Sequence, residues 1–140
     1  MSAPTAEARV RVRYAETDQM GVVYHANYVV WFEVGRVELL RSLGLPYKQL
    51  EEEGILIAVV EVNARYKRPA RYDDEIAIRT TVKQVRGGSI IRIGYQVVRV
   101  CDEELLCEGE TVHVVIDREF KKSRLPDHYA ARMAGEMAGE

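Results

Sequence analysis

The sequence has few cysteines, no strong excess of either charge and no long apolar run. Its 140 residues include two cysteines, and 22 acidic against 20 basic residues give a formal net charge of −2. This balance argues against a dedicated nucleic-acid-binding protein, which normally carries a marked basic excess. The longest apolar stretch, Ile55 to Val60, is far shorter than the roughly 20 residues that span a membrane as a helix. The first residues lack the basic start and apolar segment of a signal peptide, so we expect a cytoplasmic protein.

Cysteine and histidine are too few and too scattered to indicate a metal or redox site. Cys101 and Cys107 flank a predicted hairpin turn, and neither belongs to a Cys-x-x-Cys pair. In a reducing cytosol we expect both to be free thiols. The three histidines, His25, His113 and His128, form no metal-binding motif. We therefore expect no metal and no cofactor.

The hydrophobic content, 47% of the chain, is that of an ordinary globular protein. The sequence contains no evident linker, internal repeat or low-complexity segment. A chain of this length buries roughly two-thirds of its unfolded surface, which is enough for one sizeable core. We expect one domain over residues 1–140, with residues 1–7 and 134–140 as loose ends.

The first part of the sequence predicts a short strand, a polar loop and one long helix. Residues 10–14 alternate between apolar side chains and arginine, which is the period of a strand with one buried face. From about residue 24 to 43 the apolar spacing is helical. Gly44 is well placed to end this helix, and Pro46 prevents its continuation. The predicted buried stripe comprises Tyr28, Val29, Phe32, Val37, Leu39, Leu40 and Leu43.

The remaining sequence predicts about four strands joined by tight turns. Alternate residues from 56 to 66 form one continuous apolar face. Gly87-Gly88 is a strong hairpin signal, and Gly94 in the following strand predicts a bulge or a bend. A last strand near residues 106–116 and a short helix near 126–133 complete the chain.

This order of elements indicates the fold class. Only one helix is long enough to cover a sheet, and the repeated strand–helix alternation of a doubly wound fold is absent. We therefore expect an α+β fold, in which an antiparallel β-sheet wraps around one long central α-helix. The outer face of this sheet is then left open, and a partner subunit is the natural candidate to cover it.

The loop between the first strand and the long helix holds the candidate chemistry. Asp18 supplies a carboxylate, and Gly21 permits unusual dihedrals or a close backbone approach. The unpaired N–H groups of a helix N-terminus can stabilise an oxyanion that develops on a carbonyl. Asp18 could attack that carbonyl or activate water, and His25 could orient the water or donate to the substrate. From the residues alone, a capping role for Asp18 and a purely structural His25 are open alternatives.

The same loop carries a family resemblance. Residues 14–28 read Tyr-Ala-Glu-Thr-Asp-Gln-Met-Gly-Val-Val-Tyr-His-Ala-Asn-Tyr. This segment resembles the acyl-CoA thioesterases of the hot-dog fold, in the 4-hydroxybenzoyl-CoA thioesterase-like branch that includes the Tol–Pal-associated enzymes. That branch is marked by an Asp followed by Gly-Val-Val-Tyr-His-Ala-Asn/Ser-Tyr, which this sequence matches from Asp18 onwards. Residues 66–74 and 86–89 are also similar to that branch, so the resemblance covers about residues 8–128.

The resemblance implies hydrolysis of an acyl-CoA thioester to a free acid and CoA, without metal or redox cofactor. It assigns the catalytic carboxylate to Asp18, as nucleophile or general base, and places His25 and Tyr14 in the same site. The oxyanion donors would be backbone N–H groups at the start of the helix, around Val23, Tyr24 and His25. It also implies a homodimer as the minimum assembly, and a tetramer is common in the family.

Charged residues outside the loop give two further hypotheses. Glu33 and Arg36 lie three apart within the apolar helix face and could pair, either at a subunit contact or to position the Asp18 loop. CoA carries phosphates that basic clusters can bind. One cluster comprises Arg65, Lys67, Arg68 and Arg71, and the other comprises Lys121, Lys122 and Arg124. For each cluster, a solvated strand end is the open alternative.

Two other functions stay open at this point. A hot-dog hydratase or dehydratase would act on enoyl or hydroxyacyl thioesters, and a non-catalytic protein would bind acyl-CoA without cleaving it. The complete motif from Asp18 to His25 favours hydrolysis over both. The acyl group is not specified, because apolar strand residues are expected in any core.

Overall fold

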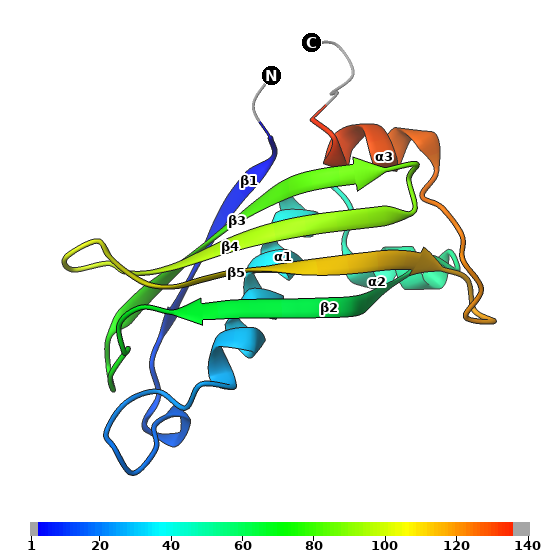
Figure 1. The fold of residues 1–140 in the computed structure, drawn as a ribbon. Helices are drawn as coiled ribbons and strands as arrows, with labels where there is room; N and C mark the ends of the chain where they lie inside the picture. The colour runs from blue at the N-terminus through cyan, green and yellow to red at the C-terminus, as the bar shows by residue number, and fades with distance from the viewer. Residues whose placement is uncertain (1–2, 136–140) are drawn as a thin grey trace.

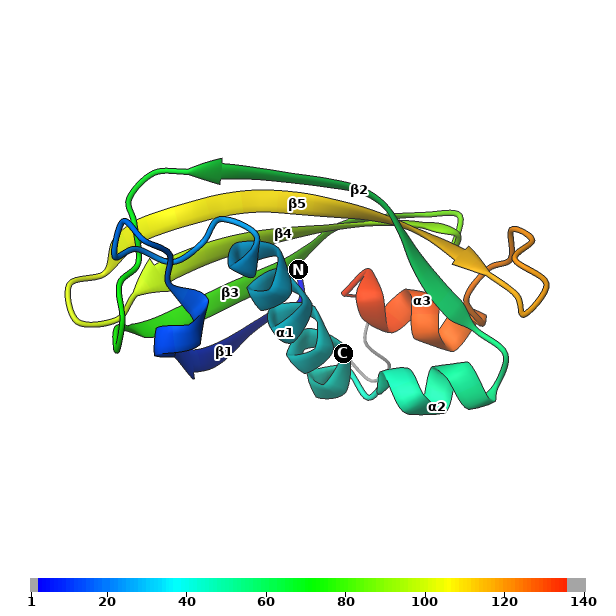
Figure 2. The same cartoon turned by 90° about the horizontal axis from the view of Figure 1, so that it is seen from below.

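A computed structural model describes residues 3–135 of the chain. Its elements are, in order, β1 (Thr5–Arg11), η1 (Tyr14–Glu16), α1 (Asn27–Ser42), α2 (Tyr47–Glu52), β2 (Leu56–Tyr66), β3 (Glu75–Arg86), β4 (Ile90–Arg99), β5 (Glu104–Ile116) and α3 (Asp127–Met133). The five strands form one antiparallel sheet in the order β1-β3-β4-β5-β2. The sheet curls around α1, and α2 and α3 lie beyond the C-terminal end of α1 (Figure 1 and Figure 2). The predicted α+β fold with one central helix is therefore confirmed.

α1 packs directly on the sheet through one face. Its buried residues are Tyr28, Trp31, Phe32, Gly35, Arg36, Leu39 and Leu40. The ring of Phe32 stacks on that of Tyr95 in β4, with ring centroids 4.4 Å apart. Gly35 lies so close to β3 that an added Cβ would be 2.6 Å from Cγ2 of Ile78. Position 35 therefore admits no side chain unless the helix moves away from the sheet.

The observed limits of α1 differ from the prediction at one end. Residues 24–26 precede the helix, with a turn at 25 and 26, and the N–H of Asn27 donates to the carbonyl of Tyr24 at 3.0 Å. The C-terminal end is as predicted, because Gly44 follows the helix in the left-handed conformation with a φ of 77°. Val29, predicted to be buried, is 38% exposed, since it lies on the side of the helix that the sheet does not cover.

The N-terminal strand differs from the prediction at both ends. β1 begins at Thr5, so residues 5–7 pair with β3 instead of forming a loose end. The strand ends at Arg11, and Tyr14 begins the short 3₁₀ helix η1 with 77% of its surface exposed. The alternation misled the prediction because Val12 still faces the core after the strand has ended. Of the other predicted loose end, residues 136–140 lie outside the described residues.

The β3–β4 hairpin confirms one glycine prediction and corrects another. Gly87-Gly88 forms the turn, with φ values of 61° and 70°. Gly94, which was expected to mark a bulge or a bend, is in register with both neighbouring strands, so no bulge lies at this residue. The register shift lies across the strand pair, between Val82 and Gln84. The space over Gly94 is instead filled by the flexible side chain of Lys83, which an added Cβ would displace.

β2 is an edge strand with an interrupted apolar face. A register shift between Val59 and Glu61 breaks the continuous alternation that the sequence predicts over residues 56–66. Val59, Val60 and Val62 are exposed at 45%, 59% and 41%. Uncovered apolar surface is therefore concentrated at this edge and on the open side of α1.

The sheet face that points away from α1 is charged. Arg79 on β3 pairs with Glu7 on β1 at 3.0 Å, and Arg92 on β4 pairs with Glu110 on β5 at 3.0 Å. An antiparallel sheet with a polar face can stand against water. Such a charged face does not by itself require a covering subunit, and its coverage by a partner stays a prediction. Within residues 3–135, no helix is both long and apolar enough to cross a membrane.

Glu33 and Arg36 do not form the predicted pair. Glu33 is exposed, whereas Arg36 is buried and donates to the hydroxyls of Tyr47 at 3.3 Å and Tyr95 at 3.1 Å. A separation of three residues turns a side chain by about 60° around the helix axis. Glu33 therefore lies outside the buried face of the helix, and the Arg36 guanidinium donates its hydrogen bonds to the phenol oxygens instead.

A chain of polar groups continues from Arg36 into the core. The Tyr95 hydroxyl lies 2.6 Å from Oγ1 of Thr111, which lies 2.7 Å from Nε2 of His113. His113 is fully buried, and this burial, with a smaller contribution from the Arg36 charge, lowers its pKa to about 3. The imidazole is therefore neutral at neutral pH.

Both cysteines are free, as predicted. Cys101 is exposed, and Cys107 is buried in β5. Burial raises the pKa of the Cys107 thiol to about 11, so it stays protonated and unreactive.

Candidate active site

The loop between β1 and α1 is closed by its own backbone hydrogen bonds. The Asp18 N–H donates to the carbonyl of Val22 at 2.9 Å, and the Gly21 N–H donates to the Asp18 carbonyl at 2.9 Å. Gly21 has a φ of 80°, which glycine adopts without strain. Thr17 and Val23 form an isolated antiparallel bridge at the base of the loop. The loop is thus a compact turn with Asp18 at its first corner.

The turn engages only one oxygen of the Asp18 carboxylate. Oδ1 accepts a hydrogen bond from the N–H of Met20 at 2.9 Å, as in an Asx turn. Among the described residues, Oδ2 has no donor within hydrogen-bond distance, and no basic group forms an ion pair with the carboxylate. Asp18 does not cap α1, whose N-cap residue is Ala26. Asp18 therefore has a structural role, but it stabilises a turn through Oδ1 and does not cap the helix. Its Oδ2 remains available for chemistry.

Two backbone carbonyls fasten this loop to the rest of the chain. The carbonyl of Glu16 accepts from the N–H of Tyr24 at 2.9 Å. The carbonyl of Ala70, in the connection between β2 and β3, accepts from the N–H of Val23 at 2.9 Å. The Ala70 N–H in turn donates to the buried hydroxyl of Tyr28 at 3.0 Å. The loop, the first turn of α1 and the β2–β3 connection are therefore held together as one unit.

A cavity of about 310 Å³ lies where these three segments meet. Its lining includes Asp18 from the loop, His25 just before α1, and Tyr28 in the first turn of α1. Tyr66 at the end of β2 and the following residues Lys67 and Arg68 complete this side. One end of the sheet carries all of these segments, and α2 and α3 lie at the other (Figure 2). The structure therefore brings Asp18 and His25 together, as the sequence predicts.

The three predicted oxyanion donors differ in whether their N–H groups already have an acceptor. The N–H groups of Val23 and Tyr24 already donate to the carbonyls of Ala70 and Glu16. The N–H of His25 has no acceptor within the part of the chain that the structure describes. Of the predicted set, only the His25 N–H is free to bind a substrate oxygen.

Two tyrosines that the sequence indicated only as structural residues form one wall of the cavity. Tyr66 is 49% exposed and donates from its hydroxyl to the carbonyl of His25 at 3.0 Å. Its ring meets the ring of Tyr28 edge-on, with centroids 5.2 Å apart and planes at 80°. Burial raises the pKa of the Tyr66 phenol, which is therefore a protonated donor at neutral pH. In the sequence, Tyr66 continues the alternating apolar pattern of β2, so the pattern does not distinguish it from structural residues. Its position at the end of the strand is the one signal that could have indicated a functional role.

Tyr14 is not part of this cavity. Its ring packs edge-on against the ring of Tyr72, with centroids 5.8 Å apart, and most of its surface faces solvent. The resemblance placed Tyr14 in the same site as Asp18 and His25, but within one protomer the structure does not bring it there. The reason is local, because η1 turns the chain away from the strand direction at this residue.

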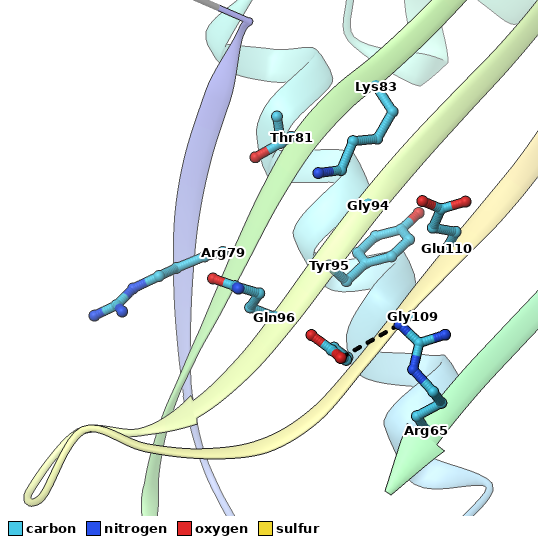
Figure 3. Close-up of a pocket in the computed structure, with 10 residues that line it drawn as sticks. Arg65, Arg79, Thr81, Lys83, Gly94, Tyr95, Gln96, Gly109 and Glu110 are labelled. Carbon is cyan, nitrogen blue, oxygen red and sulfur yellow. Dashed lines mark hydrogen bonds and ion pairs between the residues drawn. The ribbon is translucent and has the colours of Figure 1, made fainter. Parts of the chain in front are cut away.

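The first basic cluster divides between two sides of the sheet. Lys67 and Arg68 line the cavity with Asp18, and Nζ of Lys67 also lies 3.5 Å from Glu108, the carboxylate that Arg65 contacts. Arg65 points to the outer face and pairs with Glu108 at 3.3 Å. It borders a hollow of about 230 Å³ above Gly94, which Figure 3 shows among charged side chains on the face away from α1. Arg71 is exposed and lines neither cavity.

The outer hollow is a less suitable site for carbonyl chemistry. Its two carboxylates are paired across the strands: Glu108 with Arg65, the contact marked at Arg65 in Figure 3, and Glu110 with Arg92. Among the described residues, its lining comes from strands alone, without a helix N-terminus. The cavity beside Asp18 instead combines a carboxylate oxygen and a backbone N–H that have no partner among the described residues, and these two kinds of group can serve acyl transfer to water.

Comparison with known proteins places the chain among thioesterases. A family model described as the thioesterase-like superfamily matches residues 12–133. YneP of Bacillus subtilis (strain 168) is 39% identical over 128 residues, covering 87% of this chain and 91% of that protein. YbgC of Escherichia coli O157:H7, named an acyl-CoA thioester hydrolase, is 36% identical over 123 residues, covering 87% of this chain and 90% of that protein.

Solved structures share the fold over nearly the whole chain. The crystal structure of the DHNA-CoA thioesterase from Staphylococcus aureus superposes with a TM-score of 0.81 and 34% sequence identity. The superposition covers 86% of this chain and 80% of that one. The hot-dog architecture indicated by the motif at Asp18 is therefore confirmed.

Proposed function

Because this chain belongs to the thioesterase-like superfamily and is a thioester hydrolase, we propose that it cleaves acyl-CoA in the cavity beside Asp18. One observation carries the proposal. Asp18 has a carboxylate oxygen, and His25 a backbone N–H, without a partner among the described residues. Both residues line the same cavity of about 310 Å³. The products are a free acid and CoA.

Asp18 supplies the nucleophile or creates it. In the first route, its free oxygen attacks the thioester carbonyl carbon, the C–S bond breaks and CoA leaves as the thiolate. Water then hydrolyses the resulting anhydride and restores the carboxylate. In the second route, Asp18 takes a proton from the water that attacks the carbonyl. Both routes consume one water and release one acid and one thiol.

The His25 N–H stabilises the oxyanion that forms on the carbonyl oxygen. It lies just before α1, where the partial positive charge of the helix terminus adds to the single hydrogen bond. Val23 and Tyr24 contribute by holding the loop with their own N–H groups, not by contacting the oxyanion. The His25 imidazole lies beside them and can orient water or the substrate, as the sequence indicated.

Lys67 and Arg68 bind the charged part of CoA at the mouth of the cavity. Lys67 is 3.5 Å from the carboxylate of Glu108, whereas Arg68 has no ion-pair partner among the described residues. Phosphate oxygens are strong acceptors for such groups. Their place on the cavity lining favours this cluster over the one formed by Lys121, Lys122 and Arg124.

Two copies of the chain associate through the β2 edge and the open side of α1. Val59, Val60 and Val62 are exposed on β2, which pairs only with β5 in the described sheet, and its free edge is a template for pairing with another chain. Val30 on α1 adds a further exposed apolar side chain. Tyr14 would take part in the reaction only at the cavity of another subunit. The tetramer stays a prediction, as does the cytoplasmic compartment.

A thiol-release assay tests this function. The protein is incubated with short, long and aromatic acyl-CoA thioesters, and free thiol and free acid are measured together. Equal amounts of both are expected. A hydratase would instead add water across an enoyl-CoA without releasing thiol, and a binding protein would retain intact acyl-CoA. Either result would exclude hydrolysis as the function.

A further inference from the structure

We propose that Tyr66 is a positioning residue that fixes the direction of the His25 N–H through the hydrogen bond from its hydroxyl to the His25 carbonyl. The inference rests on the proposed function, because it concerns the donor that stabilises the oxyanion. Tyr66 is the last residue of β2, and His25 lies 41 positions earlier, just before α1. The bond therefore joins the end of a strand to the beginning of the catalytic helix.

The peptide planes on both sides of His25 are held by hydrogen bonds. The plane before it is held at the Tyr24 carbonyl, which accepts from the N–H of Asn27 at 3.0 Å. The plane after it is held at the His25 carbonyl, which accepts from Tyr66 at 3.0 Å and from the N–H of Tyr28 at 3.3 Å. The bond from Tyr28 is long for an N–H donor, so the phenol provides the shorter contact. With both planes held, the His25 N–H has one direction.

The surroundings of Tyr66 keep its hydroxyl in place. Its ring meets the His25 ring edge-on, with centroids 6.3 Å apart and planes at 85°. On the other side it packs against Tyr28, whose own hydroxyl is held by the N–H of Ala70 at 3.0 Å. The phenol is thus supported by a residue that is itself fixed to the β2–β3 connection.

This placement explains why a half-exposed phenol borders the cavity. His25 precedes the regular helix, so the i to i−4 bonds of α1 do not hold its N–H. A donor that is misdirected by a small angle stabilises the transition state less, although it still permits substrate to bind. The loss of the Tyr66 hydroxyl should therefore lower kcat and leave KM nearly unchanged.

Tyr66→Phe removes the hydroxyl and keeps the ring contacts. We expect kcat for acyl-CoA hydrolysis to fall about ten-fold, the size of one neutral hydrogen bond, with KM within about two-fold of wild type. Tyr129→Phe is the matched control, because its hydroxyl donates to Glu53 at 3.3 Å between α3 and the end of α2, at the other end of the molecule. That control should change neither constant.

Several outcomes separate this inference from the function on which it rests. An unchanged kcat in Tyr66→Phe, or a rise in KM alone, overturns the positioning role while wild-type hydrolysis stands. Absence of thiol release from wild-type protein overturns the proposed function itself. Urea unfolding of both variants at the assay temperature shows that kcat is compared between folded proteins, and a kcat loss matched by partial unfolding of Tyr66→Phe also overturns the role.

Discussion

The N–H of Met20 holds one oxygen of the Asp18 carboxylate at 2.9 Å, and the turn that it closes needs no charge on that carboxylate. A neutral amide oxygen at position 18 could accept the same bond. The second oxygen has no donor in the described part of the chain and belongs to a residue that lines the cavity. The structural and the chemical roles of Asp18 are therefore separable, because one oxygen serves each.

Basic residues at the cavity mouth should determine the apparent affinity for acyl-CoA. Replacing Lys67 or Arg68 by alanine removes a cation that lies beside the proposed phosphate path, so KM should rise roughly three- to ten-fold with little change in kcat. Steady-state kinetics with one acyl-CoA measure this. Lys122→Ala, in the second cluster, should keep the wild-type KM. The reverse pattern would assign the nucleotide to the second cluster.

The edge of β2 should control the oligomeric state. Val60→Lys places a charge on an exposed apolar edge, and we expect the dimer to dissociate at micromolar concentration. Light scattering coupled to size-exclusion chromatography reports the mass. Gln96→Lys adds the same charge to the outer sheet face and should leave the dimer intact. A wild-type monomer, or a dimer that survives Val60→Lys, would contradict this interface.

Two glycines should be required for different physical reasons. Gly35→Ala forces a methyl group against Ile78 and Thr80, so we expect a loss of about 1–3 kcal/mol in the free energy of unfolding. Gly21→Ala meets no atom within 4 Å, and its cost of about 1 kcal/mol comes only from the φ of 80°. Urea unfolding measures both. A Gly35→Ala protein as stable as wild type would show that α1 does not pack on β3 as described.

The buried His113 should make stability depend on pH in the acid range. Its pKa is about 3 in the folded protein against 6.5 as the ordinary value, so the unfolded chain binds the extra proton first. The contribution is fully present above pH 6.5 and is lost as pH falls from 6.5 toward 3, by up to about 1.4 kcal/mol per pH unit. Unfolding free energies at pH 7 and pH 5 should differ less in His113→Leu than in wild type. Equal differences would contradict a neutral, buried imidazole.

The fold could be predicted from the sequence because its strongest signals are local. A helical period followed by Gly44, and a Gly-Gly pair between two alternating segments, identified α1 and the β3–β4 hairpin. The end of β1 was predicted wrongly, because Val12 faces the core from an irregular position. The fate of Arg36 could not be predicted either, since its partners Tyr47 and Tyr95 are chosen by tertiary packing.

The candidate site could be predicted only in part. The motif identified Asp18 and His25, which are close in the sequence as well as in space. Tyr66 was missed because its partner, the His25 carbonyl, lies 41 residues away and is brought near by the sheet. Which of the three predicted oxyanion N–H groups is free could not be predicted either. The Val23 N–H is engaged by the carbonyl of Ala70, and no local sequence pattern connects these two residues.

Asp18→Asn separates the two roles of the Asp18 carboxylate, with thiol release from acyl-CoA as the measurement. Asparagine keeps the oxygen that accepts from Met20 and loses the free carboxylate, so the turn should persist while kcat falls by on the order of 10³-fold or more. Asp117→Asn is the matched control, because Oδ1 of Asp117 accepts from the N–H groups of Glu119 and Lys121 in a similar turn that does not line the cavity. We expect Asp18→Asn to be folded and inactive, and Asp117→Asn to be fully active. Wild-type thiol release from folded Asp18→Asn would contradict the catalytic role of Asp18.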